Sequence, residues 1–157
     1  MKKVTLELTD EQLEEVKKII NVGKEFPKIG YEYWCIGHIG DLVSNIWLND
    51  RYDNQRLSIG NVYSTEEEAQ LQYDKLVAIQ KVKTYIKKEF GYDSEKWGVW
   101  DDYTQKYMPC WNFQERGLDY MRNTYAKYYS PIGFLETPDQ ANQLIKDMKD
   151  ELELIYK

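Results

Sequence analysis

Hydrophobic and polar residues follow two different periods at the start of the chain. Residues 4–8 alternate, which is typical of a half-buried β-strand. Thr9 and Gln12 then form a capping-box pattern, and the hydrophobic residues that follow, up to position 20, have the spacing of an amphipathic helix. Residues 1–26 are therefore predicted to form a short β-α segment.

A strand pattern dominates the next stretch of the chain. Residues 31–36 and 42–48 are rich in aromatic and β-branched residues, and a glycine-containing turn separates them, which predicts a β-hairpin. Residues 49–54 have the composition of a polar turn, and residues 55–59 alternate again. We therefore predict a third short strand before the next helix.

A long amphipathic helix is predicted after these strands. Thr65 and Glu68 form a second capping box, and hydrophobic residues recur on one helical face over residues 69–90. Gly91 has the position and chemistry of a glycine that ends a helix. Residues 27–91 are thus expected to form one antiparallel sheet covered by one helix.

The rest of the chain repeats this order. A strand is predicted at residues 106–113, and one or two more at residues 117–129. Thr137, followed by a proline, begins a third capping box, and the spacing predicts one amphipathic helix over residues 141–155. Residues 92–157 are therefore expected to form a second sheet-and-helix module.

The two modules also share sequence at the point where each sheet ends. Residues 60–69 and 133–141 contain, in the same order, a glycine, an apolar pair, a capping box and an alanine. Internal duplication is the interpretation we favour, and chance similarity of two sheet-and-helix units is the alternative. The predicted fold class is α+β: a short N-terminal β-α unit (1–26), then two related antiparallel-sheet-plus-helix modules (27–91 and 92–157), forming one compact or two closely packed units.

The negative net charge of the chain argues against some classes of binding partner. The chain has a net charge of -6, with 42% hydrophobic and 31% charged residues. An acidic chain has no general electrostatic attraction to nucleic-acid phosphates or anionic lipids. No apolar run approaches the roughly 18 residues that a membrane span requires. We expect a cytoplasmic protein without a membrane partner.

Few residues suggest catalysis. His38 is the one histidine of the sequence, and it lies in a predicted turn. Cys35 and Cys110 lie in aromatic, strand-like surroundings, where a buried and reduced thiol is expected. The sequence contains neither zinc-ligand spacing nor a glycine-rich nucleotide-binding motif. We therefore predict no catalytic residue, no metal and no cofactor.

One group of carboxylates merits a separate interpretation. Asp50 and Asp53 share a predicted turn with Arg56, shortly after Trp47. Carboxylates that converge from separate elements can hold catalytic metal ions, which is one alternative. The interpretation we favour is that Asp50, Asp53 and Asn54 bind the turn backbone through their side chains.

Several segments together resemble a known family. The matching residues are Pro27, Lys28, Gly30, Glu32, Tyr33, Trp34, Trp47, Leu48, Asn49, Asp50, Asp53, Arg56 and 60–69 in the first module, Asp101, Gln105, Lys106, Tyr107, Gly133, Phe134 and Ala141 in the second, and 4–13 at the start. This pattern is similar to a family of small proteins encoded by phages and prophages of Gram-positive bacteria, and it covers most of the chain. The family has no assigned chemistry, so the resemblance implies a phage or prophage origin and a host bacterial cell. Small proteins of that origin are often inhibitors of bacterial defence, including anti-CRISPR proteins.

A direct role in nucleic-acid binding is not expected. The lysines that cluster late in the predicted helix over residues 69–90 are typical of a solvated helix face: Lys81, Lys83, Lys87 and Lys88. The acidic surface could instead mimic nucleic acid, which the sequence leaves open. A nucleic-acid- or small-ligand-binding protein of phage physiology is the alternative to the function predicted below.

Protein binding is the function that the composition favours. Aromatic residues make up 15% of the chain, and tyrosine, methionine and arginine are enriched in interface cores. The expected contacts are Arg116, Tyr120, Met121, Arg122, Tyr125, Tyr128 and Tyr129, with a second surface at Trp47, Asp50, Asp53 and Arg56. We predict a non-enzymatic protein that inhibits a bacterial defence component by steric blockade, with an RNA-guided CRISPR nuclease or its nucleoprotein complex as the leading partner.

Overall fold

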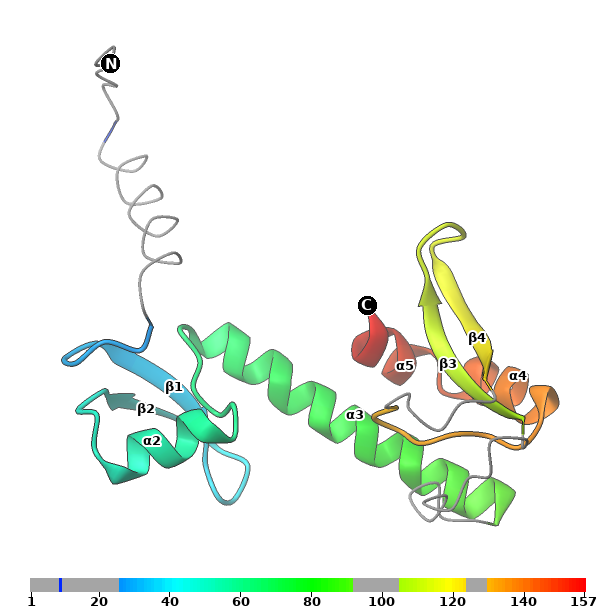
Figure 1. The fold of residues 1–157 in the computed structure, drawn as a ribbon, viewed down its shortest axis with the longest axis horizontal. Coiled ribbons are helices and arrows are strands. Elements are labelled where there is room, and N and C mark those ends of the chain that lie inside the picture. The colour runs from blue at the N-terminus through cyan, green and yellow to red at the C-terminus, as the bar shows by residue number, and fades with distance from the viewer. Residues whose placement is uncertain (1–8, 10–25, 92–104, 124–129) are drawn as a thin grey trace. The chain divides into compact units, whose positions relative to one another are not determined.

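The computed structural model describes four parts of the chain, residues 9, 26–91, 105–123 and 130–157. The strand and helix predicted within residues 1–26 lie outside these described residues, apart from Thr9. The described parts contain two small antiparallel sheets and four helices, so the predicted α+β class is confirmed. Figure 1 labels these elements: β1 (Glu32–Ile36), β2 (Leu42–Ile46), α2 (Arg51–Ser58), α3 (Glu66–Phe90), β3 (Lys106–Asn112), β4 (Gly117–Asn123), α4 (Pro138–Asp147) and α5 (Lys149–Tyr156).

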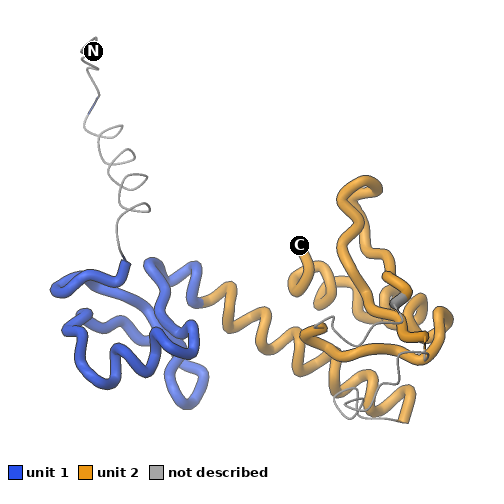
Figure 2. The backbone as a smooth tube through the Cα atoms, in the orientation of Figure 1, with its two compact units in different colours: residues 1–69 blue, residues 70–157 orange. Residues whose placement is uncertain are grey.

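The chain divides into two compact units, residues 1–69 and 70–157, which Figure 2 shows in different colours. The sequence predicted a boundary between residues 91 and 92, at the end of a helix. The structure instead places the division inside α3, after its first turn.

The sheet of unit 1 is centred on β1. This strand pairs with β2 along one edge, with Tyr33 opposite Asn45. Its other edge pairs with the segment before α3, where the backbones of Trp34 and Tyr63 exchange hydrogen bonds of 2.8 and 2.9 Å. The side-chain amide of Asn61 continues this edge by bonding both backbone groups of Ile36 at 2.8 Å. Residues 61–63 therefore act as a short third strand on the sheet.

The core of unit 1 is small and aromatic. Tyr33, Cys35 and Trp47 are buried, and Val43 and Val62 pack against them. The rings of Tyr33 and Trp47 meet edge to face with their centroids 5.6 Å apart, a favourable geometry for an aromatic pair.

A helix occupies the region where the sequence predicted a polar turn and a third strand. α2 begins after Asp50, whose side chain accepts a 2.8 Å hydrogen bond from the backbone N–H of Asp53, and Asp53 bonds back to the N–H of Asp50 at 3.4 Å. This is a complete capping box, which satisfies two backbone donors that a helix leaves unpaired at its start. The alternation over residues 55–59 was too short to identify a strand, so the strand prediction is wrong.

The core of unit 2 is larger and aliphatic. β3 and β4 pair in register from Lys106 opposite Asn123 to Asn112 opposite Gly117. The buried residues of this core come from α3, from the segment before α4, and from α4 and α5: Val82, Ile86, Ile132, Leu135, Ala141, Leu144 and Leu152. The sequence predicted that the helix after Thr65 would cover the first sheet, but the largest of its fully buried side chains, Val82 and Ile86, belong to the core of unit 2.

The C-terminal helix is interrupted at Met148. The sequence predicted one helix over residues 141–155, whereas the structure contains α4 and α5, with Met148 at φ −122° and ψ 34° between them. The Met148 N–H still donates to the Leu144 carbonyl at 2.9 Å. Leu144 and Leu152, on either side of the break, both remain fully buried in the same core.

The predicted repeat is present in the backbone connections of the described residues. In each unit the first hairpin strand pairs with the residue two positions before the helix cap, Tyr63 before Thr65 and Leu135 before Thr137. Each threonine hydroxyl accepts a 3.2 Å bond from the N–H of the third residue beyond it. The first helical alanines, Ala69 and Ala141, are both fully buried.

Candidate functional site

A buried hydrogen-bond relay connects the sheet of unit 1 to α2. The phenol of Tyr33 donates to Asp53 Oδ1 at 2.7 Å and accepts from Arg56 Nη1 at 2.6 Å. Asp53 Oδ2 also accepts a 2.7 Å bond from the backbone N–H of Leu48. The relay therefore fixes the orientation of α2 and of the Arg56 side chain, although α2 has few apolar contacts with the core.

The relay shifts the pKa values of the three side chains that form it, Asp53, Arg56 and Tyr33. Burial alone would raise the pKa of the Asp53 carboxyl, but hydrogen bonds from Tyr33 and from the backbone N–H groups of Leu48 and Asp50 outweigh it, so the pKa lies below its usual value. The hydrogen bond to Tyr33 raises the pKa of the Arg56 guanidinium above its ordinary value. Burial, with the bond to Asp53, raises the pKa of Tyr33, so this phenol stays neutral.

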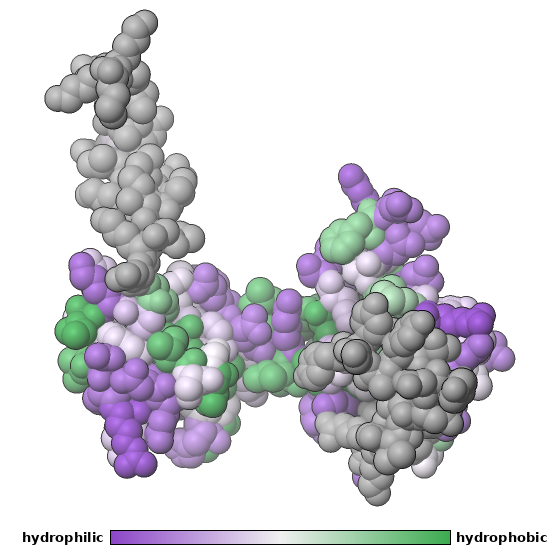
Figure 3. Space-filling model, viewed as in Figure 1, coloured by the Kyte–Doolittle hydropathy of each residue, from purple (hydrophilic) through white to green (hydrophobic). Residues whose placement is uncertain are grey.

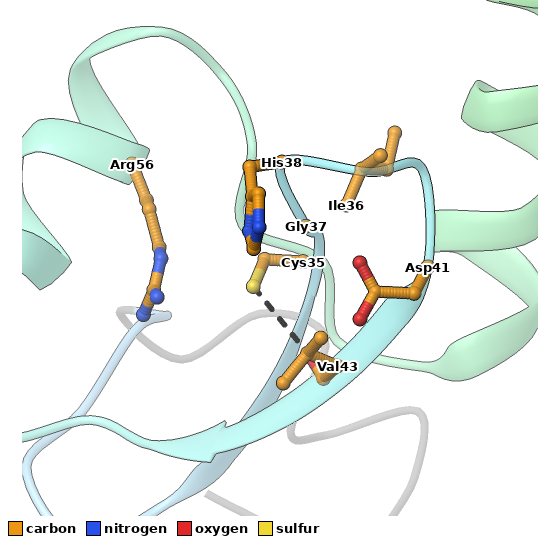
Figure 4. A pocket seen from close by; sticks show the side chains of 7 residues that line it. All are labelled: Cys35, Ile36, Gly37, His38, Asp41, Val43 and Arg56. Carbon is orange, nitrogen blue, oxygen red and sulfur yellow. Dashed lines mark hydrogen bonds between the residues drawn. The ribbon is translucent and has the colours of Figure 1, made fainter.

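A pocket of about 440 Å³ opens beside Arg56. Figure 4 shows that Arg56 enters it from α2, whereas the other lining residues come from β1, β2 and the turn between them: Cys35, Ile36, Gly37, His38, Asp41 and Val43. His38 is exposed in this turn, as the sequence predicted.

The Cys35 thiol in this pocket makes structural hydrogen bonds. The thiol donates a hydrogen bond to the Val43 carbonyl oxygen at 3.6 Å. Its sulfur accepts a hydrogen bond from the Asn45 side-chain amide at 3.5 Å. A nucleophilic cysteine requires a hydrogen-bonded base, and the donor of Cys35 is directed at a carbonyl instead. The thiol hydrogen is thus held by a backbone carbonyl and is not shared with a base.

Large hydrophobic side chains are exposed at the open end of the first hairpin. The backbones of Gly30 and Tyr31 are hydrogen-bonded to Trp47 at 2.8 Å, which brings the segment before β1 beside the segment after β2. Five exposed residues lie in these segments, at the end of β2 or at the start of α2, and we call them the hairpin-end cluster: Ile29 (65% exposed), Tyr31 (51%), Ile46 (52%), Leu48 (64%) and Tyr52 (69%). In Figure 3 hydrophobic surface is visible at the left edge of unit 1, where the turn before β1 lies in Figure 1.

The sequence did not identify the hairpin-end cluster as a site. Its members were assigned to predicted strands and turns, where an apolar residue is usually interpreted as core. The available signal was the alternation of the hairpin itself. Tyr33, Cys35 and Trp47 point to one face and are buried, which leaves Ile46 and Leu48 on the other face.

The surface predicted around Trp47 and Arg56 is only partly accessible. Trp47 and Asp53 are 3% and 4% exposed, so they support the fold and offer no area to a partner, which corrects their prediction as contacts. Asp50 is exposed at the N-cap of α2, and Arg56 is half-buried at the pocket. Asn54 bonds the backbone carbonyl oxygens of Asn49 and Asp50, as predicted for a capping side chain.

The tyrosine-rich surface predicted in the second module is divided between core and solvent. Tyr120 is half-buried and packs against the core of unit 2, with its ring 5.7 Å from that of Tyr107, so part of its side chain supports the fold. Met121 and Arg122 are exposed on β4, and Arg116 lies in the hairpin turn at φ 52°. The remaining predicted contacts lie outside the described residues: Tyr125, Tyr128 and Tyr129.

The other candidate chemistries receive little support from the geometry. Lys81 of α3 forms an ion pair with Glu151 of α5 at 3.5 Å, and Lys88 forms one with the adjacent Glu89 at 3.0 Å, so acidic residues partner two of these lysines. Within the described ranges no three histidine, cysteine or acidic residues lie close enough together to hold a metal ion. No helix in the described part of the chain has both the length and the apolar character to cross a bilayer.

Comparison of the chain with protein-family models, with curated proteins and with solved structures finds no match.

Proposed function

We propose that this protein is a non-enzymatic binding protein whose contact surface for another protein is the hairpin-end cluster. The observation that carries the proposal is the exposure of these five large hydrophobic side chains, each more than half exposed, at one end of one hairpin. Large exposed apolar side chains on a soluble domain favour an interaction site, because exposing them to water costs free energy that a partner recovers.

The scaffold beneath the cluster supports such a role. Leu48 follows Trp47, which is buried, and its backbone N–H is bonded to Asp53 at 2.7 Å. Tyr52 lies in the first turn of α2, which the capping box holds in place. A surface that is already ordered before binding loses less conformational entropy on association, so the same contacts give a higher affinity.

The proposed consequence of binding is inhibition of a bacterial defence component by steric blockade. This target class is supported by the resemblance to small phage and prophage proteins, which often act against host defence. An RNA-guided CRISPR nuclease, alone or as its nucleoprotein complex, is the first candidate to examine.

The proposal is tested by affinity capture from a Gram-positive bacterial lysate, with mass spectrometry of the recovered proteins. The wild type is compared with the double variant Leu48→Ser/Tyr52→Ser and with Ile59→Ser, which removes an apolar side chain that is 76% exposed outside the cluster. We expect one dominant protein that the wild type and Ile59→Ser retain and the double variant loses.

Two results of this capture would contradict the proposal. Equal recovery of the same partner by the double variant would exclude the hairpin-end cluster as the contact surface. Recovery of nucleic acid or a small molecule, in place of a protein, would support the alternative function of a ligand-binding protein of phage physiology.

A further inference from the structure

Arg56 gives the pocket of unit 1 a positive charge whose orientation is fixed from inside the fold. Its Nη1 donates to the Tyr33 phenol, which in turn donates to the buried carboxylate of Asp53. A guanidinium has five N–H donors, and within the described part of the chain the bond to Tyr33 is the one hydrogen bond that the Arg56 guanidinium makes. The remaining donors can serve a ligand in the pocket.

The pocket combines this cation with apolar walls. Ile36 and Val43 supply hydrophobic surface, and His38 and Cys35 also line the pocket (Figure 4). The volume of about 440 Å³ is many times the roughly 30 Å³ that one water molecule takes up in the liquid. A side chain with a charged end can therefore enter.

We propose that this pocket binds a carboxylate carried on a short apolar stem, such as a glutamate side chain or the C-terminal residue of the partner protein. A planar guanidinium matches the two oxygens of a carboxylate, and Ile36 and Val43 contact the stem. Asp41 lines the other side of the pocket in Figure 4, and its negative charge repels a phosphate dianion more strongly than a carboxylate monoanion. The inference rests on the proposed function, because it is the partner protein that supplies the carboxylate.

Short peptides test the pocket without the partner. The full-length protein is titrated with Ac-Gly-Glu-Gly-NH2, with the C-terminal carboxylate peptide Ac-Gly-Gly-Leu-OH and with the uncharged control Ac-Gly-Gln-Gly-NH2, and backbone amide NMR shifts are followed. We expect saturable shifts around residues 35–43 and Arg56 with one or both carboxylate peptides and not with the glutamine peptide. The comparison of the two carboxylate peptides identifies the source of the group.

Variants assign the binding to Arg56. Arg56→Gln should weaken carboxylate binding by about tenfold or more, because a charge-assisted hydrogen bond is lost. Arg51→Gln, in the same helix but outside the pocket, should leave it unchanged. If Arg56→Gln does not fold, His38→Asp gives the same test from an exposed turn residue, because its negative charge should also abolish binding.

Three outcomes overturn the inference: no saturable shift with either carboxylate peptide, equal shifts with the glutamine peptide, or inorganic phosphate binding as tightly as the glutamate peptide. None of them bears on the capture of a partner through the hairpin-end cluster. The two proposals can therefore fail separately.

Discussion

Tyr33 and Asp53 are joined by a 2.7 Å hydrogen bond between the phenol and one carboxylate oxygen, across 20 positions of the chain. This bond connects β1 to α2, which carries Tyr52 of the hairpin-end cluster, and the same Tyr33 phenol accepts a hydrogen bond from Arg56. The proposed contact surface and the proposed carboxylate pocket thus depend on the same buried relay.

Removal of the Tyr33 hydroxyl should destabilise unit 1. Tyr33→Phe leaves the buried Asp53 carboxylate with one hydrogen bond fewer, which should lower the free energy of unfolding by about 1–3 kcal/mol. Chemical denaturation followed by tryptophan fluorescence measures this. Tyr31→Phe is the control, since that ring is 51% exposed and should tolerate the change. Equal stability of the two variants would show that the relay contributes nothing.

Acid should remove the contribution of Asp53. The folded-state pKa of Asp53 lies below its ordinary value of 3.8, so its stabilisation is complete above that pH and is lost as the pH falls through the lower folded-state pKa. Asp53→Asn should therefore be less stable than the wild type at neutral pH, and the difference should shrink below about pH 4. Urea unfolding of both proteins across this range checks it, and a difference independent of pH would contradict the assignment.

Alkali should destabilise unit 2 through Tyr156. Burial raises the pKa of Tyr156 from 10.0 to about 12, so the folded state holds this proton more tightly than the unfolded state. The stability that the neutral phenol gives is complete below pH 10 and declines as the pH rises toward 12. Tyr156→Phe should lose this decline. Unfolding curves of the wild type and of Tyr156→Phe at several alkaline pH values measure this difference. A parallel loss of stability in the two proteins would refute the role of Tyr156.

The two helix caps should have matched energetic effects. Thr65→Ala and Thr137→Ala each remove a side-chain acceptor with the same 3.2 Å geometry, so each should cost about 1 kcal/mol. Thr84→Ala is the control, because Thr84 bonds the Gln80 carbonyl oxygen within α3 and caps nothing. If the two cap variants differ widely in thermal unfolding, the repeat is shared in geometry but not in energetics.

The sequence predicted those parts of the fold that local interactions determine. The two hairpins and the caps at Thr65 and Thr137 depend on neighbouring residues, and they appear where they were expected. The similarity of residues 60–69 and 133–141 also has a structural basis. These segments complete the sheet edge and start the helix in each unit.

The sequence failed where distant contacts decide the structure. α2 is strongly polar, and only the bonds of Asp53 and Arg56 to Tyr33 show why it is held as a helix against the sheet. The core in which the apolar face of α3 packs likewise depends on Ile132 and Leu135, which are distant from α3 in the sequence. The candidate contact Trp47 was misplaced for a related reason: aromatic composition does not distinguish a core residue from an interface residue.

The proposed contact surface is tested most directly by a binding titration of the captured partner against the purified wild type, Leu48→Ser/Tyr52→Ser and Ile59→Ser, each first shown to be folded. Loss of two interface side chains should weaken affinity by about 2 kcal/mol or more, roughly 30-fold, while Ile59→Ser binds as the wild type does. Full affinity in the double variant would contradict the assignment of the contact surface to the hairpin-end cluster.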